Sequence, residues 1–297
     1  MKTVFTALHK AIAAATCVLA VASCGHNPHT GHTAEEKAKI DSAVTAVTDT
    51  TKLKAMLNGY ASRGDLTGEA VVCRQLGKMH RENNRFAEAI ATHRRGLKAA
   101  EQTADTLEMI KALNNIGTAM RRMGVLDEAA TYHYEALGLC NRFSDKDSHD
   151  ARKCRVVSLN GIGNICLTTG NQETADSVFR LALEGERQLG SALGQAINYA
   201  NLGSIFEDNG HTDSAWVYYH KSLELNKEAG STLGISLCHN SFGRLYEQDK
   251  RYADAIREYR EAYALMEGNS DRWHWLEPCM SLARVYLDQG NMAEAKT

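Results

Sequence analysis

Apolar and small residues recur along this chain at a nearly constant interval, and the recurrence predicts how the chain folds. In the stretch 70–99, the pair Leu76-Gly77 is followed twelve residues after the glycine by Ala89, and seven residues later by Gly96. The pair returns at spacings of 40, 46, 40, 40 and 40 residues, as Ile116-Gly117, Ile162-Gly163, Leu202-Gly203, Phe242-Gly243 and, in a weaker form, Leu282-Ala283. A fixed period of about 20–50 residues is typical of folds built by stacking one repeated unit.

Each unit predicts two antiparallel helices joined by a tight turn. The first helix carries the apolar-Gly pair, and it is often followed by a glycine that suits the left-handed end of a helix: Gly124, Gly170, Gly210 and Gly290. The second helix carries the recurring Ala, then a large residue, then a small one. The large residues are His93, His133, Phe179, Tyr219 and Tyr259. Helices approach closely where small side chains meet, so we expect each large residue to fill the space beside a glycine in an all-α solenoid.

This pattern resembles the tetratricopeptide repeat. The match covers residues 68–297, in about six units of which the last is incomplete. The resemblance implies a right-handed superhelix of antiparallel helix pairs over residues 67–297. The 40-residue period is longer than the standard unit and is similar to the extended repeats of kinesin light chains.

The units depart from the family pattern at one position. His80, Met120 and Cys166 stand three residues after the glycine, where the family favours Tyr. We expect the same packing with altered side-chain volume. We also interpret His80, His93 and His133 as packing residues of the core rather than as ligands.

The residues before the first full unit predict a cap for the stack. Apolar residues between Lys37 and Tyr60 are spaced mostly by three and four, which is typical of an amphipathic helix, but the Leu-Gly pair is missing. We interpret residues 37–66 as N-terminal capping helices, which end repeats need. Further on, we expect Asn141–Lys153 to form a longer polar loop that accounts for the 46-residue spacing.

The N-terminus has the pattern of an export signal. Residues 1–23 combine two lysines with a short apolar run, which predicts a signal peptide. The residues up to Cys24 resemble a bacterial lipobox, and this predicts lipidation of Cys24 and an exported lipoprotein anchored on the periplasmic side or in the cell envelope. The alternative is an ordinary signal peptide with an accidental cysteine.

Residues 24–36 predict a flexible tether, because they lack apolar periodicity. The tether holds His26, His29 and His32 at a spacing of three, which suits a metal ion, but we favour a polar linker because a mobile segment orients no ligands. We therefore predict no metal site.

The resemblance also suggests where a partner binds. In tetratricopeptide solenoids the first helices line a concave groove, with groove residues three and two before the glycine and one and four after it. The predicted groove residues are Arg74, Lys78, Arg81, Asn114, Asn115, Arg121, Asn160, Asn164, Asn201, Asn240 and Arg244. Asn is a poor helix former, so its recurrence needs a reason, and its amide offers both a donor and an acceptor to an extended peptide. The basic N-terminal end of the groove favours an acidic segment or a terminal carboxylate; the alternative is a solvated polar groove without a partner.

The sequence gives little support for nucleic-acid binding or for enzyme activity. The 297 residues have a formal net charge of −2, which does not favour nucleic-acid binding through bulk charge. We find no catalytic set, Walker loop or dinucleotide motif, and we expect no enzyme, no cofactor and no small-molecule substrate. Cys140 and Cys154 flank the long loop and either pair as a disulfide or remain thiols.

Two functions remain open from the sequence. Its signal and repeat style resemble those of Bacteroides-type proteins, in which such arrays often precede a transmembrane helix and a DNA-binding or kinase domain. The chain stops at Thr297 inside the second helix of the sixth unit, so we expect the natural protein to continue. One hypothesis is the extracytoplasmic sensor region of a membrane-associated signalling or transcription-regulatory protein that binds a protein or peptide. The alternative is a free-standing periplasmic lipoprotein scaffold that assembles an envelope complex.

Overall fold

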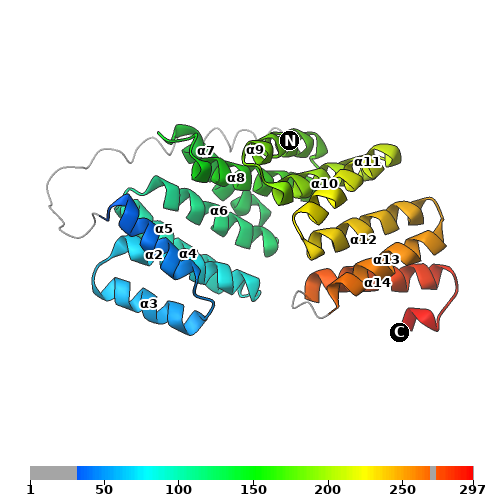
Figure 1. Cartoon of the computed structure of the whole chain (residues 1–297), viewed down its shortest axis with the longest axis horizontal. Coiled ribbons are helices and arrows are strands. Elements are labelled where there is room, and N and C mark those ends of the chain that lie inside the picture. The colour runs from blue at the N-terminus through cyan, green and yellow to red at the C-terminus, as the bar shows by residue number, and fades with distance from the viewer. Residues whose placement is uncertain (1–31, 268–271, 297) are drawn as a thin grey trace.

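Successive helix pairs stack into one curved array (Figure 1). The computed structural model describes residues 32–267 and 272–296. In this part of the chain all regular elements are helical. The pairs are α2 (Ala34–Thr45) with α3 (Thr50–Ser62), α4 (Leu66–Glu82) with α5 (Phe86–Gln102), α6 (Thr106–Arg122) with α7 (Leu126–Arg142), α8 (His149–Thr168) with α9 (Gln172–Gln188), α10 (Ala192–Asp208) with α11 (Thr212–Glu228), and α12 (Thr232–Gln248) with α13 (Tyr252–Met266); α14 (Arg272–Asp288) and the 3₁₀ helix η1 (Glu294–Lys296) follow. The expected all-α solenoid is confirmed.

The turns between helices depend on residues with positive φ. The four glycines expected at helix ends, at 124, 170, 210 and 290, have φ between 72° and 80°. Asn84, Ala104 and Lys250 occupy the same kind of position without being glycine, with φ of 58°, 53° and 58°. The residue after the turn often caps the next helix: the Asp105 carboxylate accepts a hydrogen bond from the Glu108 backbone amide at 3.1 Å.

Each large residue of a second helix lies against the glycine of the first helix, as the repeat predicts. A Cβ added at Gly77 would come within 2.4 Å of the His93 ring, and one at Gly203 within 2.7 Å of the Tyr219 ring. His80, His93 and His133 are all buried, as expected of residues that pack in the core. The absence of a side chain at these glycines sets the distance between the two helices of a pair.

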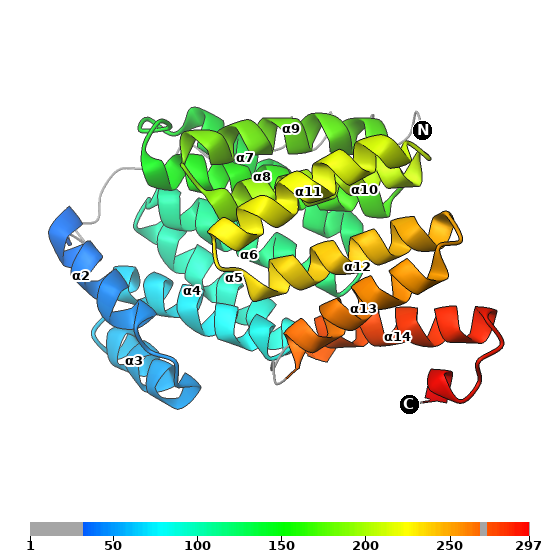
Figure 2. The same cartoon turned by 45° about the vertical axis from the view of Figure 1, so that its right-hand side comes forward.

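The first helices of neighbouring pairs form the inner layer of the stack (Figure 2). The helix pairs α2 and α4, α4 and α6, α6 and α8, α10 and α12, and α12 and α14 are in contact, whereas second helices contact one another less. In a curved stack the layer with the closer neighbours lies on the concave side. We call the exposed surface of the first helices α4, α6, α8, α10 and α12 the inner face.

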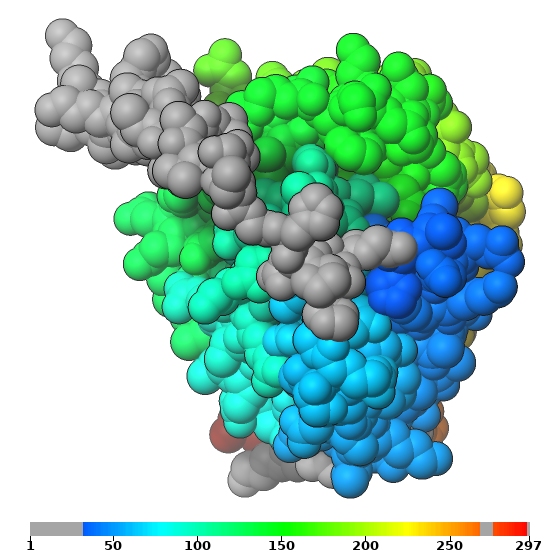
Figure 3. Space-filling view, turned by 90° about the vertical axis from the view of Figure 1, so that its left-hand side faces the viewer, coloured from blue at the N-terminus to red at the C-terminus, as the bar shows by residue number. Residues whose placement is uncertain are grey.

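The N-terminal cap differs from its expected form. Residues 37–60 do not form one helix, because α2 ends at Thr45 and α3 begins at Thr50 with Asp49 as its N-cap. The first of these helices also begins earlier than expected, at Ala34, because Thr33 and Glu36 form a reciprocal capping box. Figure 3 looks onto this end, where α2 and α3 lie beside the first repeats. The last three residues of the expected tether, 34–36, therefore belong to α2.

The long polar loop is shorter than the sequence suggested. Asn141 and Arg142 belong to α7, and α8 begins at His149 because Ser148 caps it. The unwound segment is 143–148, and α8 has 20 residues where the other first helices from α4 to α12 have 17. The inserted residues thus lengthen both the helix and the loop. Cys140 and Cys154 are free thiols in one buried cluster.

The predicted export signal (1–23), Cys24, His26 and His29 lie outside the described residues. Within the described ranges, no helix is both long and apolar enough to cross a membrane.

Candidate functional site

The predicted groove residues fall into three groups on the inner face. Some are buried in the core, some pair with carboxylates of neighbouring helix pairs, and some remain open. The three groups have different chemistry, and only the third can meet a partner without breaking an existing contact.

Two of the predicted asparagines belong to the core. Asn114 is 3% exposed; its Nδ2 donates to the Cys154 carbonyl at 3.0 Å, and its Oδ1 lies 2.9 Å from Ser158 Oγ and 3.0 Å from His133 Nδ1. Asn240 is 2% exposed and donates to Glu277 at 2.7 Å. These two predicted groove residues therefore lie in the core, where their amides donate to groups of the following first helix.

Two predicted arginines are held by carboxylates. Arg74 Nε donates to Glu108 at 3.0 Å, and its guanidinium also pairs with Asp41. Arg244 donates from Nε and Nη2 to the two oxygens of Glu207, at 3.0 Å each. Burial opposes the charge of Arg244, but the Glu207 carboxylate outweighs this effect and raises the pKa of Arg244. Both side chains join neighbouring repeats, so the expectation that they are free for a partner is wrong.

Three arginines on the inner face have no carboxylate partner. Arg81, Arg121 and Arg122, which we call the arginine cluster, form no ion pair in the described part of the chain; Arg81 donates to Asn115 Oδ1 at 3.0 Å. The pKa values of Arg81 and Arg121 are lowered, first by burial and then by the positive charge of Arg122. Lys78 differs, because it lies 3.8 Å from Glu82. The cluster therefore concentrates positive charge at the C-terminal ends of α4 and α6.

Open amide groups follow on the next two first helices. The side chains of Asn160 on α8 and Asn201 on α10 are partly exposed, whereas Asn160 Oδ1 and Asn201 Nδ2 are themselves buried and have no hydrogen-bond partner within the described residues. Asn164 uses its own Nδ2 to donate to the Asn160 carbonyl at 2.8 Å, within α8. An unpaired acceptor and an unpaired donor on adjacent repeats suit a backbone that needs both.

An apolar strip lies beside these amides, and the sequence reasoning missed it. Val157 is 41% exposed, Leu193 44% and Ile197 47%. Leu237 on α12 is partly exposed at the equivalent position. A signal was present in the sequence, because Val157, Ile197 and Leu237 each stand six residues before the repeat glycine. Exposed apolar side chains grouped on one face are typical of binding surfaces.

Two stretches of the chain match family models of the tetratricopeptide repeat, at residues 110–150 and 196–228. The chain contains tetratricopeptide repeats. This fold is generally a scaffold for protein binding, so the array is a protein-interaction module.

Several solved structures share the fold of this tetratricopeptide repeat protein. BtubC from P. vanneervenii is 18% identical with a TM-score of 0.57, over 71% of this chain and 87% of BtubC. A Rap protein complexed with competence and sporulation factor is 18% identical with a TM-score of 0.63, over 82% of this chain and 65% of the Rap chain. A STAND protein with a tetratricopeptide repeat sensor from Pyrococcus horikoshii is 14% identical with a TM-score of 0.61, over 84% of this chain and 40% of that chain.

These identities establish a shared fold and nothing more. The chain spans less than two thirds of the length of the Rap and STAND chains. A search of the curated proteins gave no match. Within the described residues, no group of three or more His, Cys, Asp or Glu side chains is placed to hold a metal ion.

Proposed function

We propose that this tetratricopeptide repeat array is a non-enzymatic module that binds an acidic peptide or protein segment along its inner face. The observation that carries the proposal is the arginine cluster, because three neighbouring cations on the binding face of the fold lack any carboxylate within ion-pair distance in the described residues. A partner that brings acidic side chains relieves their mutual repulsion.

The remaining inner-face groups suit the rest of such a segment. Acidic residues meet Arg81, Arg121 and Arg122 on α4 and α6. The backbone then exchanges hydrogen bonds with the partly exposed amides of Asn160 and Asn201, and apolar side chains of the partner cover the strip at Val157 and Ile197. Charges give the segment its direction and speed its association, whereas burial of the apolar strip supplies most of the affinity.

The cellular setting that we propose is an extracytoplasmic sensor or interaction region of a membrane-associated signalling or transcription-regulatory protein. The signal-like residues 1–23 support export, and the similar STAND and Rap structures contain a tetratricopeptide repeat sensor and a bound competence and sporulation factor, respectively. The alternative is a free-standing periplasmic lipoprotein scaffold for an envelope complex. Cys24 favours this alternative, because a lipid anchor at the N-terminus needs no transmembrane helix.

A peptide titration tests the proposed function. The full chain is titrated with fluorescent twelve-residue peptides that pair an acidic half with an apolar half, and fluorescence polarisation is compared with that of peptides whose acids are replaced by Gln and Asn. We expect the acidic set to bind, and Arg81→Gln with Arg121→Gln and Arg122→Gln to weaken binding by about tenfold or more. The matched control removes three exposed cations elsewhere, with Lys52→Gln, Arg94→Gln and Lys98→Gln. Equal binding by the acidic and amide sets contradicts the proposal, as does an equal loss in both triple variants.

A further inference from the structure

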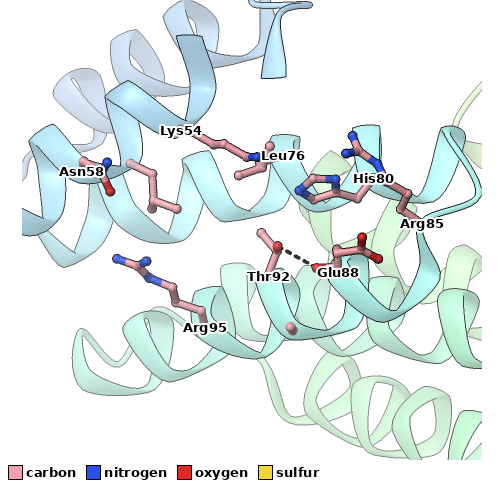
Figure 4. Close-up of a pocket in the computed structure, with 10 residues that line it drawn as sticks. Lys54, Asn58, Leu76, His80, Arg85, Glu88, Thr92 and Arg95 are labelled. Carbon is pink, nitrogen blue, oxygen red and sulfur yellow. Dashed lines mark hydrogen bonds between the residues drawn. The ribbon is translucent and has the colours of Figure 1, made fainter. Parts of the chain in front are cut away.

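The N-terminal repeats also contain an open cavity of about 470 Å³ between α3, α4 and α5 (Figure 4). The helices α3 and α5 are the second helices of their pairs. The cavity therefore opens between two outer helices, and none of the arginine cluster lines it. It is a site separate from the inner face.

Cations dominate the lining of this cavity. Lys54 on α3, Arg85 at the start of α5 and Arg95 on α5 line it, against a single lining carboxylate, Glu88. The Arg95 guanidinium is already paired, with Nε 2.6 Å from Glu69. Neither Lys54 nor Arg85 forms an ion pair within the described residues. Two uncompensated cations thus face one open space, which attracts an anion.

A buried histidine adds a hydrogen-bonding group to the same cavity. His80 is 4% exposed, and its Nδ1 has no hydrogen-bond partner in the described residues. Burial lowers the pKa of His80, the charges of Arg85 and Lys54 lower it further, and Glu88 opposes them. The imidazole is therefore neutral at pH 7, with one nitrogen able to donate and the other to accept. Buried polar atoms normally have partners, and this unpaired one belongs to a side chain that lines the cavity.

The side chains are arranged along the cavity from end to end. Figure 4 shows His80 and Arg85 at one end, Arg95 and Asn58 at the other, and Leu76 between them. The cavity volume lies within the range of small-molecule sites, about 300–1,000 Å³. Basic side chains beside apolar ones suit a small molecule that carries acidic groups on a carbon skeleton.

We propose that this outer cavity binds a small organic anion, whose carboxylate or phosphate groups are held by Lys54 and Arg85 with a hydrogen bond from His80. The ligand enters between α3 and α5 and packs its carbon skeleton against Leu57 and Leu76. The proposal does not depend on peptide binding at the inner face, because no residue of the arginine cluster lines the cavity.

Calorimetric titration of the full chain tests this site. The probes are citrate, succinate, glycerol phosphate and inorganic phosphate, each against sodium chloride of matched ionic strength. We expect binding of at least one probe, and the comparison of succinate with the phosphates separates the two ligand chemistries. Lys54→Gln with Arg85→Gln is expected to lower the association constant by about tenfold or more. The matched control is Lys52→Gln with Arg94→Gln, which removes the same charge from exposed positions outside the cavity.

A local readout shows whether the anion occupies this cavity. The pKa of His80, followed by NMR of its ring, is expected to rise in the presence of the bound probe, because a nearby anion favours the charged imidazole. The acidic peptides of the inner-face titration are expected to bind the Lys54 and Arg85 variant as they bind the wild type. The proposal is overturned if no probe binds beyond the chloride control, if both double variants lose affinity equally, or if His80 does not respond.

Discussion

The ring of His93 lies over Gly77 so closely that a Cβ on that glycine would sit 2.4 Å from a ring carbon. The two residues are sixteen positions apart, and the same relationship joins Gly163 to Phe179 and Gly243 to Tyr259. The repeat therefore conserves a shape rather than a chemistry, since imidazole, phenyl and phenol rings all fill the same space. This one contact sets how each first helix lies on its second helix, and hence which residues reach the inner face.

Gly77→Ala tests this contact. The added methyl group has no room against the buried ring of His93, so we expect the free energy of unfolding to fall by about 1–3 kcal/mol, as for other overpacked sites. The matched control is Gly138→Ala in α7, where a Cβ would meet only the Arg142 guanidinium at 3.7 Å and 3.9 Å. There we expect a gain of about 0.5–1 kcal/mol from helix propensity. Urea denaturation followed by circular dichroism measures both; a loss of the same size at both glycines would refute the packing argument.

His93→Phe tests how the buried imidazole of His93 changes the pH dependence of stability. Burial lowers the pKa of His93 to about 3, with smaller contributions from Arg81, His80 and Arg74. The folded pKa lies below the usual value near 6.5, so stability due to neutral His93 is present at high pH and is lost as the pH falls below about 6.5. Between pH 7.5 and pH 5 the loss amounts to about 2 kcal/mol.

Phe occupies the equivalent position in a later repeat and does not titrate. Both nitrogens of His93 lack hydrogen-bond partners in the described residues, so the substitution breaks no bond. We expect the free energy of unfolding of the variant to equal or exceed that of the wild type at pH 7.5. At pH 5 the difference in favour of the variant is expected to be larger by about 2 kcal/mol. Urea midpoints at the two pH values provide the comparison. A constant difference at both pH values would show that His93 does not contribute to the pH dependence.

Ala104→Gly tests the strain in one turn. Ala104 is exposed and has φ of 53°, a conformation that costs a residue with a Cβ about 1 kcal/mol relative to glycine. Glycine stands at the equivalent position of other repeats, with φ of 80° at Gly124. We expect the free energy of unfolding to rise by about 1 kcal/mol, measured by urea denaturation. Gly124→Ala serves as the reverse experiment and is expected to lose a similar amount, so a change of the same sign in both would contradict the argument.

Arg244→Gln and Arg121→Gln separate structural arginines from open ones. Removal of Arg244 leaves Glu207 buried without its counter-ion, and we expect a loss of about 2 kcal/mol, below the value for fully buried pairs because Arg244 is partly exposed. Arg121 has no such partner in the described chain, and its loss reduces repulsion from Arg122. We therefore expect the stability of that variant to equal or exceed that of the wild type. Thermal unfolding of both variants side by side decides the matter; destabilisation by Arg121→Gln would place it among the structural residues.

The repeat could be predicted from the sequence because its signal is local. Gly77 and His93 lie in adjacent helices, and their spacing is visible in the chain. Whether each asparagine is buried or accessible to a partner could not be predicted from the sequence in the same way. Asn114 and Asn160 both stand three residues before a glycine, yet Asn114 is buried because Ser158 and the Cys154 carbonyl, about forty positions later, satisfy its amide. Such partners belong to the next repeat, and the periodicity does not specify them.

The sequence also does not show which arginines have a carboxylate partner. Arg81 stands four residues after its repeat glycine and Arg244 one residue after, and the sequence gives both a positive charge on the inner face. Only the structure shows that Glu207 neutralises Arg244, whereas Arg81 donates to Asn115 and forms no ion pair within the described residues. The composition of one helix face thus indicates which groups are present, whereas the neighbouring repeat determines which of them remain available.

Asn160→Ala with Asn201→Ala tests whether the open amides hold a partner backbone. Asn160 Oδ1 and Asn201 Nδ2 form no hydrogen bond within the described residues, so truncation removes no existing contact of these atoms. Alanine also has the higher helix propensity. We therefore expect helicity to stay constant and the melting temperature to stay constant or rise, while affinity for acidic peptides falls by about tenfold. The control is Asn114→Ala, which breaks bonds to Ser158 and the Cys154 carbonyl and is expected to lower the melting temperature. Unchanged peptide affinity in the double variant would remove the amides from the binding face and leave the arginine cluster and the apolar strip as its functional part.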